Sequence, residues 1–140
     1  MIFIMSKVAV VYWSQTGNTE AMANAVAEAA GAELITAADF SADKANEFDA
    51  FAFGCPALGA EVLEEDEFQP MWDAVKANLN GKKIALFGSY GWGDGEWMRN
   101  WEEDAKSAGA DLVTDSVTAN EAPDDDALAA CKALGEALAQ

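Results

Sequence analysis

The sequence predicts an α/β protein built on a doubly wound, five-stranded parallel sheet with helices on both faces. Short apolar runs alternate with segments of helical periodicity along all 140 residues, which is the pattern of repeated strand–helix units. The apolar runs are continuous rather than alternating, as expected for strands that are buried on both faces. Right-handed crossovers between such units favour the strand order 2-1-3-4-5 and a three-layer sandwich.

Each expected element follows from its own local pattern. The strands should span 8–13, 32–36, 50–54, 83–88 and 111–117, and the helices 18–30, 42–46, 67–80, 96–108 and 124–139. In the first helix Met22, Val26 and Ala29 fall on one face. The third helix should end before Gly81, because a glycine commonly supplies the left-handed residue that closes a helix. The last helix starts at an acidic run from Asp124, which suits the positive end of the helix dipole.

Length and composition indicate one globular domain over residues 1–140, with residues 1–5 as an extension ahead of the first strand. Apolar residues make up 51% of the chain and charged residues 24%, which is typical of a packed core and a solvated surface. The uncharged apolar stretches are too short to span a bilayer. The apolar start, Met1 to Met5, has no basic residue ahead of it, unlike a signal peptide. These features predict a cytoplasmic protein with no membrane partner.

Acidic residues dominate the charge of the chain. There are 25 Asp and Glu residues against 8 Lys and Arg, which gives a net charge of −17. Repulsion excludes nucleic acid as a default partner. Two interpretations of the acidic surface remain open: it keeps the chain in solution, or it steers basic partner proteins toward the molecule.

The two cysteines, Cys55 and Cys131, are far apart in a chain that contains no histidine. This composition offers no recognisable zinc site, and we expect no bound metal. Both cysteines should be reduced, structural thiols, because no cationic residue near Cys55 would stabilise a thiolate.

The loop after the first strand predicts a phosphate-binding site. Its residues are Ser14, Gln15, Thr16, Gly17, Asn18 and Thr19. They lead into a helix N-terminus, where unpaired backbone N–H groups and the helix dipole favour an anion. No Lys or Arg lies between Lys7 and Lys44, so a neutral cradle for one terminal phosphate is expected rather than a triphosphate loop, which needs a lysine. An ordinary capped turn would use the same residue types, and that alternative stays open.

Two further loops should meet the first one at the carboxyl edge of the sheet, where doubly wound folds bind their ligands. The loop after the third strand contains Pro56, Ala57, Leu58, Gly59, Ala60 and Glu61, and the loop after the fourth contains Ser89, Tyr90, Gly91, Trp92 and Gly93. Glycines let backbone approach a ligand closely, and Trp92 offers a flat stacking surface. The alternative for Trp92 is that its ring folds back over the end of the sheet.

Taken together, the three loops resemble those of flavodoxins, in particular the short-chain members from anaerobic bacteria. The most specific matches are residues 12–19, 54–61 and 86–93, and the resemblance covers the chain from Lys7 onward. It implies a flavodoxin-like fold, non-covalently bound FMN and no enzymatic activity. The implied function is that of a low-potential one-electron carrier, which shuttles electrons between redox proteins through the semiquinone/hydroquinone couple. The implied partners are oxidoreductases and flavodoxin or ferredoxin reductases with basic patches, and the implied state is a monomer.

The resemblance also implies roles for single residues. Residues 14–19 would hold the FMN phosphate, Trp92 would cover the outer flavin face and Leu58 the inner face. Glu61 would accept the flavin N3–H, and the peptide between Gly59 and Ala60 would turn toward N5. Leu58 stands where relatives often have Met, and Ala60 where a turn-favouring residue is common.

Three other classes of protein remain as alternatives. A flavin-dependent quinone or FMN reductase would need a site for NAD(P)H phosphates, for which this acidic chain offers little. A phosphoryl-accepting response regulator shares the strand order, but it needs acids where this chain has Trp13, Ser14 and Gln15. A non-redox binding module would ignore added FMN.

Overall fold

A computed structural model describes residues 7–59, 61–91 and 93–140 of the chain. Its sheet is parallel and has the strand order β2-β1-β3-β4-β5, as predicted, with β6 also paired to β4. The strands are β1 (Val8–Tyr12), β2 (Glu33–Thr36), β3 (Ala50–Gly54), β4 (Lys83–Tyr90), β5 (Asp111–Leu112) and β6 (Val117–Asn120). Every residue of β1 and β3 is buried, because helices cover the sheet on both sides.

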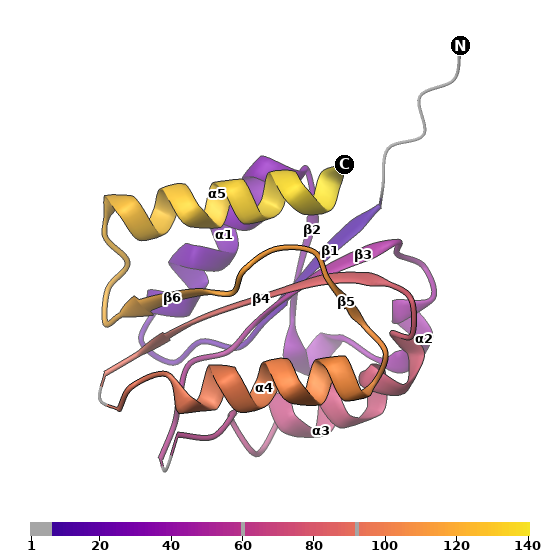
Figure 1. Cartoon of the computed structure of the whole chain (residues 1–140), viewed down its shortest axis with the longest axis horizontal. Helices are drawn as coiled ribbons and strands as arrows, with labels where there is room; N and C mark the ends of the chain where they lie inside the picture. Colours follow the sequence, from indigo (N-terminus) through magenta and orange to yellow (C-terminus); the bar gives the residue numbers. More distant parts are fainter. Residues whose placement is uncertain (1–6, 60, 92) are drawn as a thin grey trace.

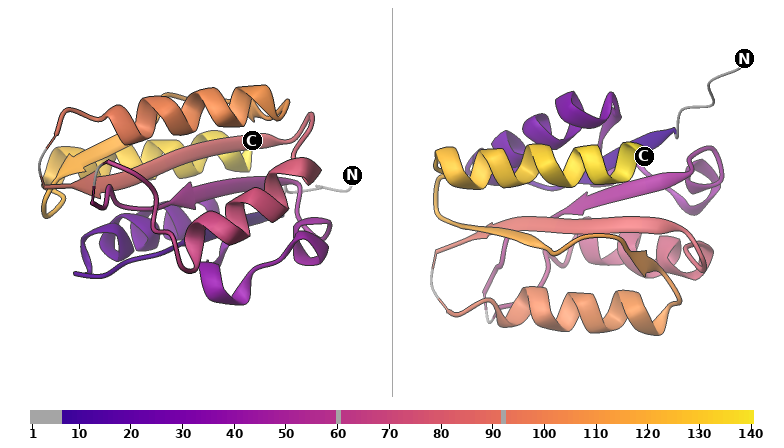
Figure 2. Two further views of the ribbon diagram at one scale, coloured as in Figure 1. Left: turned by 90° about the horizontal axis from the view of Figure 1, so that it is seen from below. Right: turned by 45° about the horizontal axis from the view of Figure 1, so that its top comes forward.

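The helices form two layers around this sheet. They are α1 (Asn18–Ala30), α2 (Ala42–Ala45), α3 (Phe68–Val75), α4 (Glu96–Ser107) and α5 (Asp125–Ala139), with single 3₁₀ turns η1 (Ala37–Asp39) and η2 (Lys76–Asn78). Figure 1 and Figure 2 show α1 and α5 on one face and α3 and α4 on the other. The predicted doubly wound, three-layer architecture is therefore confirmed.

The prediction of one last strand over 111–117 is wrong. β5 pairs with the start of β4, where Ile84 lies opposite Leu112, and β6 pairs with its end, where Phe87 lies opposite Val117. Between these pairs the outer segment has two more residues than β4, so part of it must leave the ladder. This part is polar, and its Ser116 hydroxyl donates to the Glu102 carboxylate of α4 over 2.7 Å.

Helix ends agree with the expected capping residues, although the third helix is shorter than predicted. α3 stops at Val75 and continues as η2, after which Gly81 takes the expected left-handed conformation with φ 79°. The Asp124 carboxylate accepts the backbone N–H of Ala127 over 2.8 Å and so caps α5. In this part of the chain the sequence signals for helix starts are more reliable than those for helix lengths.

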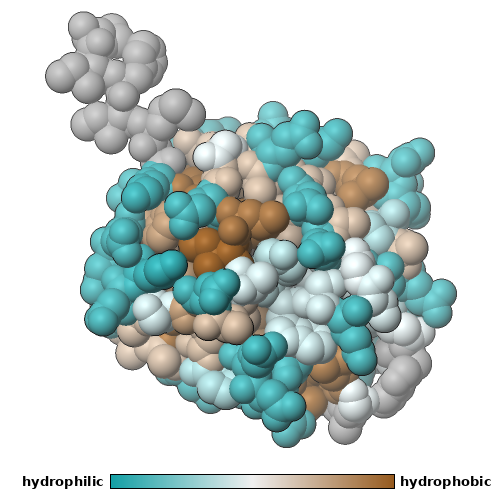
Figure 3. Space-filling model, turned by 180° about the vertical axis from the view of Figure 1, so that it is seen from behind, coloured by the Kyte–Doolittle hydropathy of each residue, from teal (hydrophilic) through white to brown (hydrophobic). Residues whose placement is uncertain are grey.

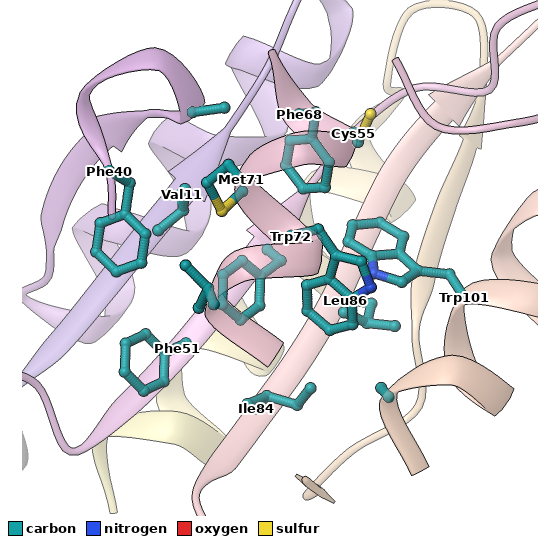
Figure 4. Packing of buried hydrophobic residues seen from close by; sticks show 14 of the residues in the cluster. Val11, Phe40, Phe51, Cys55, Phe68, Met71, Trp72, Ile84, Leu86 and Trp101 are labelled. Carbon is teal, nitrogen blue, oxygen red and sulfur yellow. The ribbon is translucent and has the colours of Figure 1, made fainter. Parts of the chain in front are cut away.

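Two separate clusters of side chains fill the space above and below the sheet. The cluster under α3 and α4 is rich in aromatic rings, among them Trp72 and Trp101 (Figure 4). The centroids of these two rings lie 5.8 Å apart, and the ring planes are at 90° to each other. The cluster under α1 and α5 is built from smaller side chains, mainly Ala and Val. It also contains Cys131. The two faces of the sheet therefore differ in the kind of side chain that packs on them.

Both cysteines are free thiols with buried side chains. Burial raises the pKa of Cys131 to about 11, and burial likewise raises the pKa of Cys55 well above its ordinary value. The Cys55 sulfur also accepts the backbone N–H of Glu64 over 3.4 Å. Neither thiol is therefore a reactive thiolate, which fits the structural role expected for both.

Neither a metal-binding cluster nor a membrane span is found among the described residues. Over 7–59, 61–91 and 93–140, no three His, Cys, Asp or Glu side chains are grouped so as to hold a metal ion. In the same ranges, each helix is too short or too polar to cross a bilayer.

Candidate functional site

A cavity of about 480 Å³ lies where the three predicted loops meet, at the carboxyl ends of the strands. Its lining residues are Ser14, Gln15, Thr16, Asn18 and Thr19 after β1, Pro56, Ala57 and Leu58 after β3, Ser89, Tyr90 and Gly91 at the end of β4, and Glu121 and Ala122 after β6. The volume falls within the range of roughly 300–1,000 Å³ that is usual for small-molecule sites. Sheet topology and loop chemistry thus converge on one place.

The loop between β1 and α1 is closed by its own first side chain. The Ser14 hydroxyl accepts the backbone N–H of Gly17 and that of Glu20, each over 3.2 Å. Gly17 takes the N-cap position of α1 with φ 93°, which a residue with a side chain rarely adopts. A Cβ there would touch nothing within 4 Å, so the backbone angle alone explains the glycine.

The open side of this loop presents hydrogen-bond donors to the cavity. The backbone N–H groups of Asn18 and Thr19 donate no hydrogen bond to any residue that the structure describes. Gln15, Thr16 and Asn18, which have neutral polar side chains, are among the lining residues, and no Lys or Arg is. Free amides at a helix N-terminus with neutral donors around them suit an anion such as a terminal phosphate.

A buried hydrogen bond connects this loop to the end of β4. The hydroxyl oxygens of Thr19 and Ser89 lie 2.8 Å apart, and the two residues are only 1% and 5% exposed. Because they are 70 positions apart in the chain, this bond fixes the first loop against the third.

The segment after β3 forms a tight turn. Leu58 and Val62 exchange two backbone hydrogen bonds of 2.9 and 3.0 Å. Within the turn Gly59 has φ 53° and Glu61 has φ 57°. Left-handed backbone is uncommon for a glutamate, and such conformations gather at functional sites. The remaining turn residue, Ala60, lies outside the described residues, so the conformation expected for its peptide with Gly59 stays a prediction.

The loop after β4 is held against the loop after β3. The Trp97 indole N–H donates to the carbonyl of Cys55 over 3.1 Å, and a Cβ on Gly88 would overlap that same carbonyl. Farther along, the Glu61 carboxylate accepts the backbone N–H groups of Asp94 and Gly95 over 3.1 and 3.3 Å. Two hydrogen bonds thus join the two loops, and a third joins the loop after β3 to α4.

Two acids near the cavity are compensated by partners. Burial alone would raise the pKa of Glu64, but hydrogen bonds from the backbone N–H groups of Phe68, Glu67 and Asp66 outweigh it and lower this pKa below its usual value. These bonds measure 2.7–2.9 Å. The Asp94 carboxylate pairs with the Arg99 guanidinium over 3.0 Å. Hydrogen bonds or an ion pair therefore offset the negative charge of these two acids.

Not every predicted site residue lines the cavity. Gly17, Gly59, Glu61 and Gly93 lie in the three loops without contributing to the lining, and Ala60 and Trp92 lie outside the described residues. Sequence reasoning missed the lining residues Glu121 and Ala122. Glu121 has φ 60°, and its N–H donates to the carbonyl of Tyr90 over 2.7 Å. The topology could have indicated these two residues, because the carboxyl ends of parallel strands share one edge of the sheet. The segment after the last strand therefore also reaches the cavity.

Comparison with known proteins agrees with this geometry. The sequence model of a family described as flavodoxin matches residues 10–135. The flavodoxin of Megasphaera elsdenii is 44% identical over 138 residues, which cover 95% of this chain and 98% of the relative. The flavodoxin of Clostridium beijerinckii is 43% identical over 121 residues, or 83% of this chain and 88% of the relative.

Solved structures show the same likeness in three dimensions. The solution structure of the two-electron reduced Megasphaera elsdenii flavodoxin superposes with a TM-score of 0.86 at 42% identity, covering 94% of this chain and 98% of that one. A flavodoxin from the domain Archaea has a TM-score of 0.80 at 30% identity, covering 95% and 96% of the two chains. By sequence and by fold, the chain belongs to the flavodoxin family, FMN-binding proteins that carry electrons to redox partner proteins rather than act as enzymes.

Proposed function

We propose that the residues around this cavity hold FMN and make the chain a low-potential electron carrier for partner proteins with basic patches. The observation that carries the proposal is the meeting of three loops in one cavity, with a neutral anion cradle at the N-terminus of α1. A mononucleotide has one terminal phosphate, and the cradle has free amides and hydroxyls for one such group.

Each part of the site has a task that suits its chemistry. FMN, when bound, supplies the one-electron redox chemistry, and the protein supplies binding and orientation. Residues 14–19 form the cradle for its phosphate, and the apolar Leu58 and the proposed stacking residue Trp92 cover the ring faces and exclude water. Glu61 is the proposed acceptor for the ring N3–H, since Leu58 at the start of its turn lines the cavity and its carboxylate bonds the loop after β4.

Carboxylates near the site would lower the potential at which bound FMN takes up negative charge. A unit charge about 10 Å away, at an effective dielectric of ~20–80, costs roughly 0.4–1.7 kcal/mol. The pairing of Asp94 with Arg99 reduces its share. Glu121 is the acidic residue among those lining the cavity, and no Lys or Arg is among them.

We further propose that the chain works as a monomer in the cytoplasm. Its net charge of −17 favours basic partners and opposes self-association. Among the described residues, large hydrophobic side chains are exposed only at Leu34 and Val62, and on the face drawn in Figure 3 the apolar areas are bordered by hydrophilic residues. Two free, buried cysteines are typical of reducing compartments.

Titration of the FMN-free protein tests the proposal. We expect one FMN to bind per chain with quenching of flavin fluorescence. FAD should bind at least about tenfold more weakly, because its phosphates are not terminal and lose at least one charge-assisted hydrogen bond in the cradle. Riboflavin, which has no phosphate, serves as the control ligand. Equal affinities for FMN and FAD would contradict a cradle for a terminal phosphate.

Replacing Trp92 by alanine tests the proposed stacking. FMN binding should weaken by about 1–3 kcal/mol, the usual contribution of an aromatic side chain that stacks on a base-like ring. Fluorescence of the flavin that remains bound should partly return, because the quenching indole is gone. The Trp13→Ala variant, which removes an indole from the first loop instead, separates a stacking effect from a general loss of aromatic rings. An unchanged FMN dissociation constant would place Trp92 outside the site.

A further inference from the structure

We infer that Trp97 of α4 is a positioning residue, which fixes two walls of the cavity against each other although it does not itself line the cavity. It contacts the segment after β3 and the end of β4. These two segments supply the lining residues 56–58 and 89–91. The effect of Trp97 on FMN binding rests on the proposed function, whereas its effect on the two walls concerns contacts within the chain.

The first contact is a buried hydrogen bond. The indole N–H of Trp97 donates to the carbonyl of Cys55 over 3.1 Å, and the two residues are only 2% and 0% exposed. This carbonyl directly precedes Pro56, the first lining residue of the segment after β3. A buried carbonyl needs a donor, because leaving it unpaired costs free energy. Trp97 thus fixes the peptide from which this wall starts.

The second contact is made with the other wall. The ring centroids of Trp97 and Tyr90 lie 5.5 Å apart, and the ring planes are inclined by 47°. Tyr90 is half-buried and lines the cavity. Aromatic rings at this separation attract each other beyond the effect of the area that they bury. One indole therefore holds a residue on each of the two walls.

The backbone leaves little freedom around the first contact. A Cβ on Gly88 of β4 would overlap the carbonyl of Cys55, and it would lie 3.2 Å from the Trp97 ring. Two residues beyond this carbonyl, the N–H of Ala57 donates to the carbonyl of Ser89 over 3.0 Å. The start of the wall is thus enclosed between β4 and the indole, and the bond of Ala57 reports whether the wall stays in place.

Trp101 offers a matched comparison one helical turn farther along α4. It is also 2% exposed, and its ring packs edge to face on Phe68 and Trp72 (Figure 4). Among the described residues, nothing accepts from its indole N–H. Replacement by phenylalanine removes the same atoms at either position. Only at Trp97 does it also remove a hydrogen bond to a wall of the cavity.

Loss of this hydrogen bond should loosen the wall before FMN binds. In Trp97→Phe an aromatic ring remains beside Tyr90, but the carbonyl of Cys55 loses its donor. FMN must then order the segment after β3 as it binds, and this ordering lowers the affinity. A Trp97 that only filled the core would lower the free energy of unfolding and leave the FMN affinity of the folded protein unchanged.

The test compares Trp97→Phe with Trp101→Phe, each as the full chain. Amide hydrogen exchange of Ala57, measured by NMR without FMN, reports local opening of the wall. Exchange of Val10 reports global unfolding, because Val10 is buried in the middle of β1 between two paired strands. Fluorescence titration then reports the FMN dissociation constant of the folded protein.

We expect the two variants to differ in both readouts. In Trp97→Phe, exchange of Ala57 should accelerate roughly 3- to 10-fold more than exchange of Val10, and the FMN dissociation constant should rise roughly 3- to 10-fold. In Trp101→Phe, exchange of Ala57 should accelerate no more than that of Val10. Its FMN dissociation constant should stay within about twofold of the original value, because the truncation lowers global stability alone.

Two results would overturn the inference: equal effects of the two substitutions on FMN affinity, or no selective acceleration at Ala57 in Trp97→Phe. A failure of the proposed function looks different, because the original chain itself then binds no FMN. In that case the ligand half of the inference falls. Selective acceleration at Ala57 would still support the role of Trp97 at the wall, and its absence would still contradict that role.

Discussion

Replacing Asn18 by aspartate is expected to weaken FMN binding at least tenfold. Asn18 is the first residue of α1 and lines the cavity, so the new carboxylate would stand among the donors of the anion cradle. A unit charge about 6 Å from a phosphate dianion, at an effective dielectric of ~20–80, costs roughly 1.4–5.5 kcal/mol. Titration of the FMN-free variant with FMN measures the change. Riboflavin affinity should change far less, because riboflavin has no phosphate.

The same substitution should not harm the fold, which separates binding from stability. An acid in the first turn of a helix interacts favourably with its dipole, by about 0.3–1 kcal/mol. The midpoint of chemical unfolding without FMN should therefore stay unchanged or rise slightly. Asn24→Asp makes the identical chemical change at an exposed position farther along α1, and it should leave FMN affinity within about twofold because salt screens the longer distance. Equal losses in the two variants would show a general charge effect rather than a cradle.

Replacing Trp72 by alanine is expected to lower the free energy of unfolding by about 3–5 kcal/mol, the usual cost of truncating a fully buried tryptophan. The side chain is 0% exposed, and its ring meets Phe53 at 5.2 Å and Trp101 at 5.8 Å, both edge to face. Its indole N–H donates to the Asp104 carboxylate over 2.7 Å. Figure 4 shows Trp72 and Trp101 among the other buried side chains of this cluster. The total free energy of unfolding of a domain of this size is roughly 5–15 kcal/mol.

Denaturant unfolding without FMN measures this loss, because bound FMN would add its own stabilisation. Trp72→Phe is the matched control. It keeps an aromatic ring and loses the hydrogen bond to Asp104 with part of the packing, so its cost should be smaller, about 1–2 kcal/mol. The cavity proposed to hold FMN has no lining residue from α3, and the folded Trp72→Ala protein should bind FMN as the original chain does. A loss below about 1 kcal/mol would mean that the cluster repacks around the vacancy.

The strand order and most of the elements could be predicted from the sequence, because buried parallel strands and capped helices leave strong local signals. β3 and α1 begin and end at the expected residues, since apolar runs and turn residues mark both ends. The division of the last strand could not be predicted. It depends on the register in which Val117 pairs with Phe87 of β4 after two extra residues. This register is set by the pairing of two strands and not by the sequence of the outer segment alone.

The site was predicted in part for a similar reason. Loops such as residues 14–19 carry unusual composition, and their place in the fold follows from topology. Glu121 carries no such composition, and only the three-dimensional edge of the sheet places it at the cavity. The bonds between Glu61 and residues 94–95 depend on two left-handed turns that face each other, which sequence spacing does not reveal.

The bonds at Ser14 determine the direction in which its hydroxyl can act. A hydroxyl oxygen has two lone pairs and one hydrogen, and here the amides of Gly17 and Glu20 occupy both lone pairs. Only the hydroxyl hydrogen remains, so toward the cavity Ser14 can donate a hydrogen bond but cannot accept one. A ligand group that brings only hydrogens, such as an ammonium ion, finds no counterpart at Ser14, whereas oxygen atoms rich in lone pairs do. The folded chain thus sets the polarity of this part of the cavity before any ligand arrives.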